Sequence, residues 1–168
     1  MVTGAGVVTP LGIGWRVNAD GFRVGRAAFG PVSLFDVSRH RVKTAAEVDL
    51  PPDLPPTGLT PKLARRLDRA SRMLLLAAHE AWQQSRWEPS PDLPVVLGTT
   101  SGGMSLGEEY YRRALDALSS RRGQPSRALH YLAHVQARMI LEAFGFLGPI
   151  TIIANACASG ANALGHAW

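Results

Sequence analysis

The strongest pattern of hydrophobic and polar positions lies in the middle of the chain, where apolar residues recur every three or four positions from Pro61 onward. This spacing is the period of an amphipathic helix, and it predicts one long helix that ends near Ser85. The stretch DLPPDLPPTGLTP at 49–61 predicts a surface loop, because its prolines cannot lie inside a helix or a central strand. The apolar positions of the helix are Leu63, Leu67, Ala70, Met73, Leu74, Ala77, Ala78 and Ala81.

Three short apolar runs predict strands: VTGAGVV at 2–8, LPVVLGTT at 93–100 and ITIIANA at 150–156. After the first run, Thr9 and Pro10 resemble a helix cap followed by proline at the first helical position. A turn or short helix is therefore expected to begin there.

Two further helices are predicted between the second and third strands, from about Leu106 to Leu118 and from about Ala128 to Phe144. The stretch SSRRGQPS is expected to end the first helix, and the segment from Gly145 to Pro149 is expected to end the second. Strands separated by helices predict an α/β fold with a parallel-type sheet.

The composition predicts a globular protein, since 46% of the 168 residues are hydrophobic and the length suits a core of single-domain size. No apolar run reaches the roughly 18 residues of a membrane span. The N-terminus lacks the basic start and long apolar stretch of a signal peptide, so a cytoplasmic protein is expected. The net charge of +5 suits an acidic partner. Nucleic acid is not expected, because the arginines are dispersed among acidic residues and no recognition motif accompanies them.

Two glycine-containing stretches fail the tests for nucleotide binding. GAGVVT has Thr9 where the dinucleotide fingerprint needs its third glycine, and no acidic residue follows about twenty positions on. GTTSGG lacks the lysine, and the serine or threonine directly after it, that close a P-loop. No nicotinamide or nucleotide cofactor is therefore expected.

The single cysteine, Cys157, follows the third predicted strand and stands at the first turn of a helix that begins near Ser159. Unpaired N–H groups and the positive end of the helix dipole favour a thiolate there. The neighbours Ala156, Ala158 and Gly160 are small, so a substrate can approach the sulfur closely. The pattern predicts an activated nucleophile, with a buried and inert structural thiol as the alternative.

The histidines of the chain do not supply an evident base for this cysteine. His166 lies nine residues along the helix, which is about 13 Å at roughly 1.5 Å per residue. His40, His79, His130 and His134 have no motif around them.

Four segments together resemble the N-terminal half of a β-ketoacyl-[acyl carrier protein] synthase: VTGAGVVTPLG, LDRASRMLLLAAHEAW, VVLGTTSGGM and GPITIIANACASGANALGHAW. Their order and spacing match as well, over nearly the whole chain. The resemblance implies a thiolase-type fold, in which two similar α/β halves form five layers. Residues 1–168 would be the N-terminal domain of such a protein, truncated after the nucleophile motif, and the full-length protein would form a homodimer.

By this resemblance, Cys157 takes an acyl group from an acyl carrier protein thioester, and its backbone N–H contributes to the oxyanion hole. Malonyl carrier protein then loses carbon dioxide, and its carbanion attacks the Cys157 thioester to give a 3-ketoacyl product. Two histidines and a lysine normally drive this second step, and they lie in the half of the family that this sequence lacks. No cofactor or metal is expected, because the phosphopantetheine arm belongs to the carrier protein.

The resemblance also implies substrate-binding positions. Ser101 aligns with a gate position beside the acyl pocket that often carries a larger apolar residue. Arg127 stands where an apolar residue commonly lines the acyl pocket of the other subunit. Leu129 and His134 replace the family's usual proline and asparagine, which puts straight-chain fatty acyl specificity in doubt. The predicted substrate-binding set is Ser101, Gly102, Gly103, Ala156 and Arg127.

Basic residues fall where the family presents positive charge to the acidic carrier protein. An ordinary solvated face is the alternative. The predicted docking set is Lys62, Arg65, Arg66, Arg121 and Arg122.

Three functions remain open. The favoured one is an acyltransferase of fatty-acid or polyketide synthesis, represented by its nucleophile half. A coenzyme A-dependent condensing enzyme of the thiolase superfamily is the second, and the long insert between the first two strands argues against it. A non-catalytic partner resembling a chain length factor is the third, and Cys157 argues against it because such partners usually lack the cysteine. Since the apolar helix after Cys157 stops at Trp168 without a cap, a fragment that is inactive alone is expected.

Overall fold

The computed structural model describes residues 1–88, 90–116 and 125–168. These residues form two compact units. The first unit consists of Met1–Pro55 and Leu75–Trp87, and the second consists of Pro56–Leu74 and Glu88–Trp168. Helix α3 (Arg69–Ser85) contributes its start to the second unit and the rest to the first.

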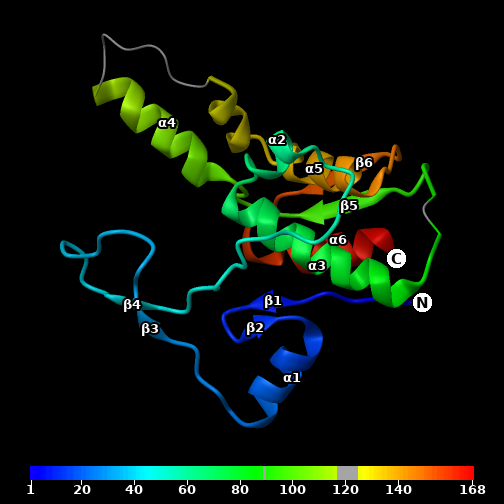
Figure 1. Ribbon diagram of the computed structural model, residues 1–168, viewed down its shortest axis with the longest axis horizontal. Coiled ribbons are helices and arrows are strands. Elements are labelled where there is room, and N and C mark those ends of the chain that lie inside the picture. Colours follow the sequence, from blue (N-terminus) through cyan, green and yellow to red (C-terminus); the bar gives the residue numbers. More distant parts are fainter. Residues whose placement is uncertain (89, 117–124) are drawn as a thin grey trace. The chain divides into compact units, whose positions relative to one another are not determined.

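The first unit holds two short antiparallel hairpins and helix α1 (Trp15–Arg23), all of them in the blue and cyan part of Figure 1. The strands of the first hairpin are β1 (Val8–Thr9) and β2 (Gly12–Ile13), and those of the second are β3 (Gly30–Pro31) and β4 (Thr44–Ala45).

The predicted first strand at 2–8 is wrong for most of its length, because the segment pairs with a helix instead of a strand. Within the first unit, the N–H of Val7 donates to Glu80 at 2.9 Å and the N–H of Ala5 donates to Gln84 at 3.1 Å. Both acceptors are side chains of α3. These bonds satisfy backbone donors that a strand ladder would otherwise use.

The predicted helix cap at Thr9 is wrong as well, whereas the turn is confirmed. Pro10 lies in the turn between β1 and β2, where its fixed φ suits the second position of a β-turn. The Thr9 hydroxyl oxygen accepts from the N–H of Leu11 at 3.1 Å, and α1 begins only at Trp15.

The second unit contains the parallel strand pair β5 (Val95–Gly98) and β6 (Ile150–Ile153). Helices α5 (His134–Phe144) and α6 (Ser159–Ala167) both pack on this pair, and they lie on opposite sides of β5 in the view of Figure 1. Two parallel strands flanked by helices confirm the α/β prediction, because a parallel pair needs a long crossover.

The predicted long helix is interrupted. A short helix α2 (Pro61–Ala64) comes first, with the Thr60 side chain accepting from the N–H of Leu63, and α3 starts afresh at Arg69. Asp68 causes the restart, since its carboxylate accepts from the N–H of Ser71 at 2.7 Å in the manner of an N-cap. The predicted end at Ser85 is confirmed.

The next two helices also differ from prediction at their starts. Helix α4 runs over Met104–Asp116, two residues ahead of the predicted start, and the predicted end at Leu118 lies outside the described residues. The predicted helix from Ala128 is a 3-10 helix, η1 (Pro125–Tyr131), followed by α5. The end at Phe144 is confirmed, and Gly145 adopts the left-handed conformation of a helix C-cap.

Helix α5 carries most of the apolar core of the second unit. Its residues Ala137, Ile140 and Leu141 are 0%, 7% and 8% exposed, and Ala163 of α6 is 7% exposed. Among the helices of the described residues, none has both the length and the apolar character needed to cross a lipid bilayer.

Candidate active site

The two parallel strands of the second unit end at the same edge, and the residues that follow them form the candidate site. Beyond β5 come Thr100 and Ser101, and beyond β6 come Ala156 and Cys157. The Thr100 hydroxyl donates to the Ala156 carbonyl oxygen at 3.1 Å, so the two connections touch. This edge is where α/β folds place their functional groups.

Cys157 lies on a tight connection between a strand and a helix. A single 3-10 turn, η2 (Ala156–Ala158), joins β6 to α6, and Cys157 is its central residue. The thiol is exposed and free. The alternative of a buried structural thiol is therefore wrong in this structure, and the predicted start of α6 at Ser159 is confirmed.

The backbone at Ala156 is strained. Its φ of 55° lies in the left-handed region, which costs a residue with a side chain about 1–3 kcal/mol. Conformations of this kind persist only where the surroundings enforce them.

Three hydrogen bonds converge on the Ala156 carbonyl oxygen and hold that conformation. Besides the Thr100 hydroxyl, the Ser159 hydroxyl donates to this oxygen at 2.7 Å, and the Ser159 N–H donates to it as well. The Ser159 hydroxyl oxygen also accepts from the N–H of Asn155 at 2.9 Å. Ser159 thus binds both the strained residue Ala156 and the residue before it, Asn155.

We call the tight connection at Ala156–Ala158 the elbow. The first turn of α6, which follows the elbow, lies directly against the end of β5 because that strand ends in Gly98. A Cβ built on Gly98 would come within 2.5 Å of the Ser159 carbonyl carbon and 2.8 Å of the Gly160 Cα. Any larger residue would force the helix and the strand apart.

The predicted substrate-binding residues Ser101, Gly102 and Gly103 form the turn between β5 and α4. Ser101 is exposed, and Gly102 has a φ of 47°, which favours glycine. A Cβ on Gly102 would lie 2.6 Å from Oε1 of Gln136, a side chain only 3% exposed whose Nε2 has no hydrogen-bond partner within the described part of the chain. Gln136 therefore packs against the turn at Gly102, Gly103 is buried, and Ser101 is exposed.

Asp68 and His130 form a buried pair that the sequence patterns did not single out. His130 Nδ1 lies 2.9 Å from Asp68 Oδ2, with the two side chains 15% and 0% exposed. The same carboxylate caps α3 and leaves no room for a side chain at Gly103, whose Cβ would lie 2.7 Å from Asp68 Cγ. The available signal was Asp68 itself, a residue type that is strongly preferred at helix N-caps; nothing in the sequence pointed to its pairing with His130.

Arg127 is engaged in an ion pair instead of standing free. Its Nη1 lies 3.1 Å from Oε2 of Glu109 on α4, and its side chain is 31% exposed. Arg113 binds the other oxygen of Glu109. The described contacts of Arg127 therefore tie η1 to α4.

The predicted docking residues Lys62, Arg65 and Arg66 are all exposed, on α2 and the turn that follows it. None of the three forms a salt bridge with another described residue. Arg121 and Arg122 lie outside the described residues.

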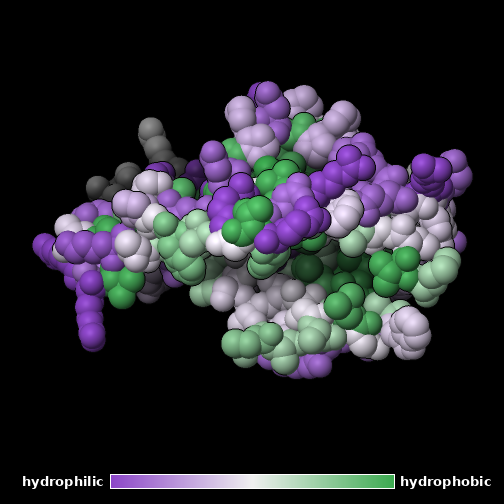
Figure 2. All heavy atoms as spheres, turned by 90° about the horizontal axis from the view of Figure 1, so that it is seen from below, coloured by the Kyte–Doolittle hydropathy of each residue, from purple (hydrophilic) through white to green (hydrophobic). Residues whose placement is uncertain are grey.

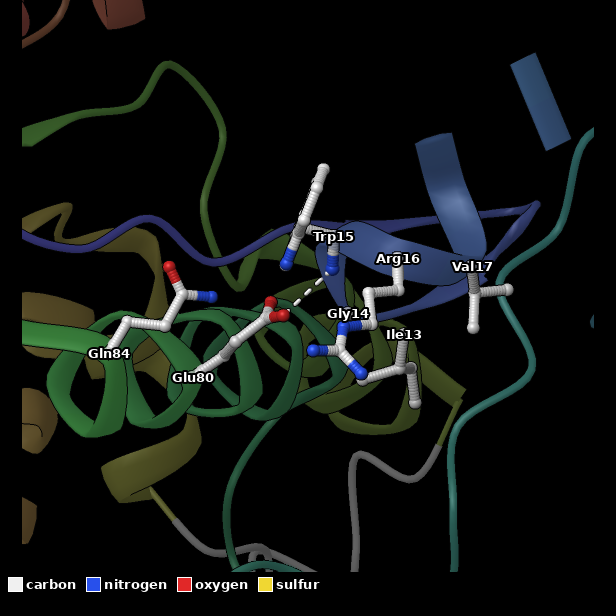
Figure 3. A pocket seen from close by; sticks show the side chains of 7 residues that line it. All are labelled: Ile13, Gly14, Trp15, Arg16, Val17, Glu80 and Gln84. Carbon is white, nitrogen blue, oxygen red and sulfur yellow. Dashed lines mark hydrogen bonds between the residues drawn. The ribbon is translucent and has the colours of Figure 1, made fainter. Parts of the chain in front are cut away.

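A separate hollow of about 360 Å³ lies in the first unit, between α1 and α3 (Figure 3). Glu80 accepts a hydrogen bond of 2.7 Å from the N–H of Trp15 there, which satisfies a free donor at the start of α1. None of the predicted site residues lines it. The lining residues are Ile13, Gly14, Trp15, Arg16, Val17, Glu80 and Gln84.

Comparison with known families gives a match over the whole chain. Residues 1–168 match the model described as the N-terminal domain of β-ketoacyl synthases.

Individual proteins agree with this match. The chain is 29% identical over 175 residues to the tetracenomycin polyketide synthase ketoacyl synthase alpha subunit of Streptomyces glaucescens, covering 99% of the chain and 41% of that protein. It is 29% identical over 173 residues to 3-oxoacyl-[acyl-carrier-protein] synthase 2 of a Synechocystis species, covering 100% of the chain and 41% of that protein. The solved structure of the ishigamide ketosynthase/chain length factor matches with a TM-score of 0.77 and 23% identity, covering 91% of the chain and 39% of that structure.

Proposed function

Because residues 1–168 match its N-terminal domain, the chain belongs to the β-ketoacyl synthase family, and we propose that it carries the nucleophile of an acyltransferase that forms carbon–carbon bonds. The fold is accordingly thiolase-like, and the chain spans 41% of the length of the relatives named above. The activity of a whole protein built on this chain is part of the proposal.

The single observation that carries the proposal is the exposed Cys157 on a strained elbow between β6 and α6. A thiol directly before the start of a helix lies near backbone N–H groups that lack partners within the helix. The same groups and the helix dipole stabilise negative charge on the sulfur and on an oxyanion beside it.

In the first proposed step, the Cys157 thiolate attacks the carbonyl carbon of an acyl thioester. The bond from that carbon to the Cys157 sulfur forms, and the bond to the carrier thiol breaks. The carrier leaves as a thiolate and takes up a proton from water, which balances the proton that the Cys157 thiol released to water on ionising. The Cys157 N–H binds the oxyanion of the intermediate.

In the second proposed step, malonyl-[acyl carrier protein] loses carbon dioxide, and its carbanion attacks the Cys157 thioester. A carbon–carbon bond forms, the bond to the Cys157 sulfur breaks, and a 3-ketoacyl thioester leaves. Residues that promote the loss of carbon dioxide are assigned to the part of the protein beyond these 168 residues. No cofactor is needed on the chain, since the phosphopantetheine arm belongs to the carrier protein.

The proposed pathway is fatty-acid or polyketide synthesis, and the proposed partners are an acyl carrier protein and a second synthase subunit. The Synechocystis relative is named for a synthase that acts with the acyl carrier protein, and the Streptomyces glaucescens relative for a polyketide synthase. The exposed cations Lys62, Arg65 and Arg66 are the proposed contacts for the acidic carrier.

The experiment that tests this function is a condensation assay on the full-length protein. Acyl and malonyl carrier proteins are supplied, and the 3-ketoacyl product and carbon dioxide are measured. Cys157→Ala is expected to abolish the product. If the protein forms no product alone but raises the product of a separate catalytic subunit, it is a chain-length-factor-like partner. Turnover of coenzyme A thioesters without the carrier protein would indicate the other thiolase-superfamily function.

A further inference from the structure

The carbonyl of Ala156 and the N–H of Cys157 belong to one peptide group. A peptide group is planar and trans, so its C=O and N–H point in opposite directions. Whatever fixes the direction of the Ala156 oxygen therefore also fixes the direction of the Cys157 N–H.

Two side-chain hydroxyls fix that oxygen from different elements. The Ser159 hydroxyl reaches it at 2.7 Å from the first turn of α6, and the Thr100 hydroxyl reaches it at 3.1 Å from the connection after β5. Each hydroxyl has one proton to donate, and each lies within hydrogen-bond distance of this oxygen. The 3.3 Å separation of the two hydroxyl oxygens reflects this convergence.

Thr100 lies far from Ala156 in the sequence, whereas Ser159 lies close to it. A bond from Ser159 to the residue three positions earlier is a local pattern that many helix starts form. The bond from Thr100 spans 56 positions and joins the ends of the two parallel strands. It therefore sets the orientation of the elbow relative to the sheet.

We infer that Thr100 and Ser159 are positioning residues that aim the Cys157 N–H at the oxyanion of the acylation step. This inference rests on the function proposed above. Neither hydroxyl needs to touch the substrate, because each acts through the Ala156 carbonyl. The strain at Ala156 is thereby explained, since the left-handed φ of 55° is the conformation that these bonds hold.

The inference separates two reactions of the same thiol. Attack on a thioester creates an oxyanion, so it needs a correctly aimed N–H. Alkylation by iodoacetamide displaces iodide at a saturated carbon and creates none. Loss of the positioning residues is therefore expected to slow acylation by a larger factor than alkylation.

The test measures both rates in the full-length protein, by mass analysis of the peptide that contains Cys157. Thr100→Val removes the hydroxyl from an exposed side chain and keeps its shape. The loss of one hydrogen bond is expected to lower the acylation rate constant about tenfold with an unchanged KM. Thr100→Ser keeps the hydroxyl and is expected to restore acylation.

The matched control is Thr99→Val, one residue earlier. The Thr99 hydroxyl forms no hydrogen bond within the described part of the chain, and its N–H donates to Ile153 through the backbone. Both rates should stay at the unsubstituted level. Ser159→Ala is expected to slow acylation further than Thr100→Val, because it removes the ties to Ala156 and Asn155 together.

The outcomes are distinct from those of the proposed function itself. If unsubstituted protein alkylates at Cys157 but never acylates there, the proposed function fails. If unsubstituted protein acylates and Thr100→Val acylates equally fast, the positioning role is overturned. A parallel fall of acylation and alkylation in Thr100→Val also overturns it, since that result means that the whole elbow has moved.

Discussion

Gly98 allows the first turn of α6 to pack directly against β5. The space that a side chain would need is taken by the backbone of α6, at 2.5 Å from the Ser159 carbonyl carbon. Neither a rotamer change nor a flexible neighbour can relieve such a clash. The fit between strand and helix thus depends on one missing side chain.

We predict that Gly98→Ala lowers the stability of the protein by about 1–3 kcal/mol, the usual cost of overpacking, and displaces Cys157. Urea unfolding of the full-length protein measures the first effect, and the rate of Cys157 alkylation measures the second. Gly165→Ala is the matched control, because nothing lies within 4 Å of a Cβ at that α6 position. A Gly98→Ala protein as stable as this control contradicts the close approach of α6 and β5.

The Asp68 carboxylate contacts three elements of the second unit. Asp68 caps α3 through the N–H of Ser71, binds His130 of η1, and fills the space beside Gly103 of the β5–α4 turn. Its side chain is 0% exposed, so water cannot replace these partners.

Asp68→Ala is expected to cost about 1 kcal/mol for the lost cap and about 1 kcal/mol more for the lost hydrogen bond to the partly buried His130. A double-mutant cycle with His130→Ala, measured by urea unfolding, should give a coupling of about 0.5–3 kcal/mol. The exposed Glu108 of α4 provides a control, since Glu108→Ala should change stability by less than about 0.5 kcal/mol. Additive effects of the Asp68 and His130 substitutions rule out the pair as a stabilising tie.

The short helix α2 and the following turn present three exposed cations. If these residues steer the acidic carrier protein, Lys62→Glu with Arg66→Glu should raise the KM for acyl carrier protein several-fold, and less so at high salt because exposed charges are screened. Activity on a small thioester mimic should be spared. The matched control reverses the exposed Arg39 and Arg41 instead. Equal losses on carrier protein and mimic argue for a structural role of α2.

The ends of α3 and α5 and the tight connection between β6 and α6 were predictable from the sequence, because their signals are local. Gly145 stops α5, and the small residues around Cys157 announce a tight connection into α6. The interruption before α3 was missed because the apolar period continues through it, whereas the cap at Asp68 uses a single side chain. The role of Thr100 was not predictable from its neighbours, since its partner Ala156 is 56 positions away.

Several large apolar side chains are exposed among the described residues of the second unit. Figure 2 shows hydrophobic residues in green on the face that it views, and in the second unit Leu147, Leu164 and Trp168 are 81%, 75% and 95% exposed. Burial of each such side chain contributes about 1.5–3 kcal/mol, against a total stability of about 5–15 kcal/mol for ordinary domains. The free energy forgone by leaving several such side chains exposed is thus comparable to the whole stability of a domain.

We predict that residues 1–168 produced alone aggregate or unfold without a cooperative transition, and that they form no 3-ketoacyl product. Calorimetry and the condensation assay measure these properties. The full-length protein, treated identically, is the control and should show a cooperative transition. A cooperatively melting 168-residue protein with condensing activity contradicts both the fragment hypothesis and the assignment of decarboxylation to residues beyond Trp168.

We propose that Cys157 is the acylated nucleophile, and peptide mass analysis after incubation with an acyl carrier protein thioester tests this role. An acyl adduct is expected on the peptide that contains Cys157 in the full-length protein. No adduct is expected in Cys157→Ala, which should fold normally because the thiol is exposed and the change is small. An adduct on another residue, or condensation of substrates with Cys157 never acylated, contradicts this role.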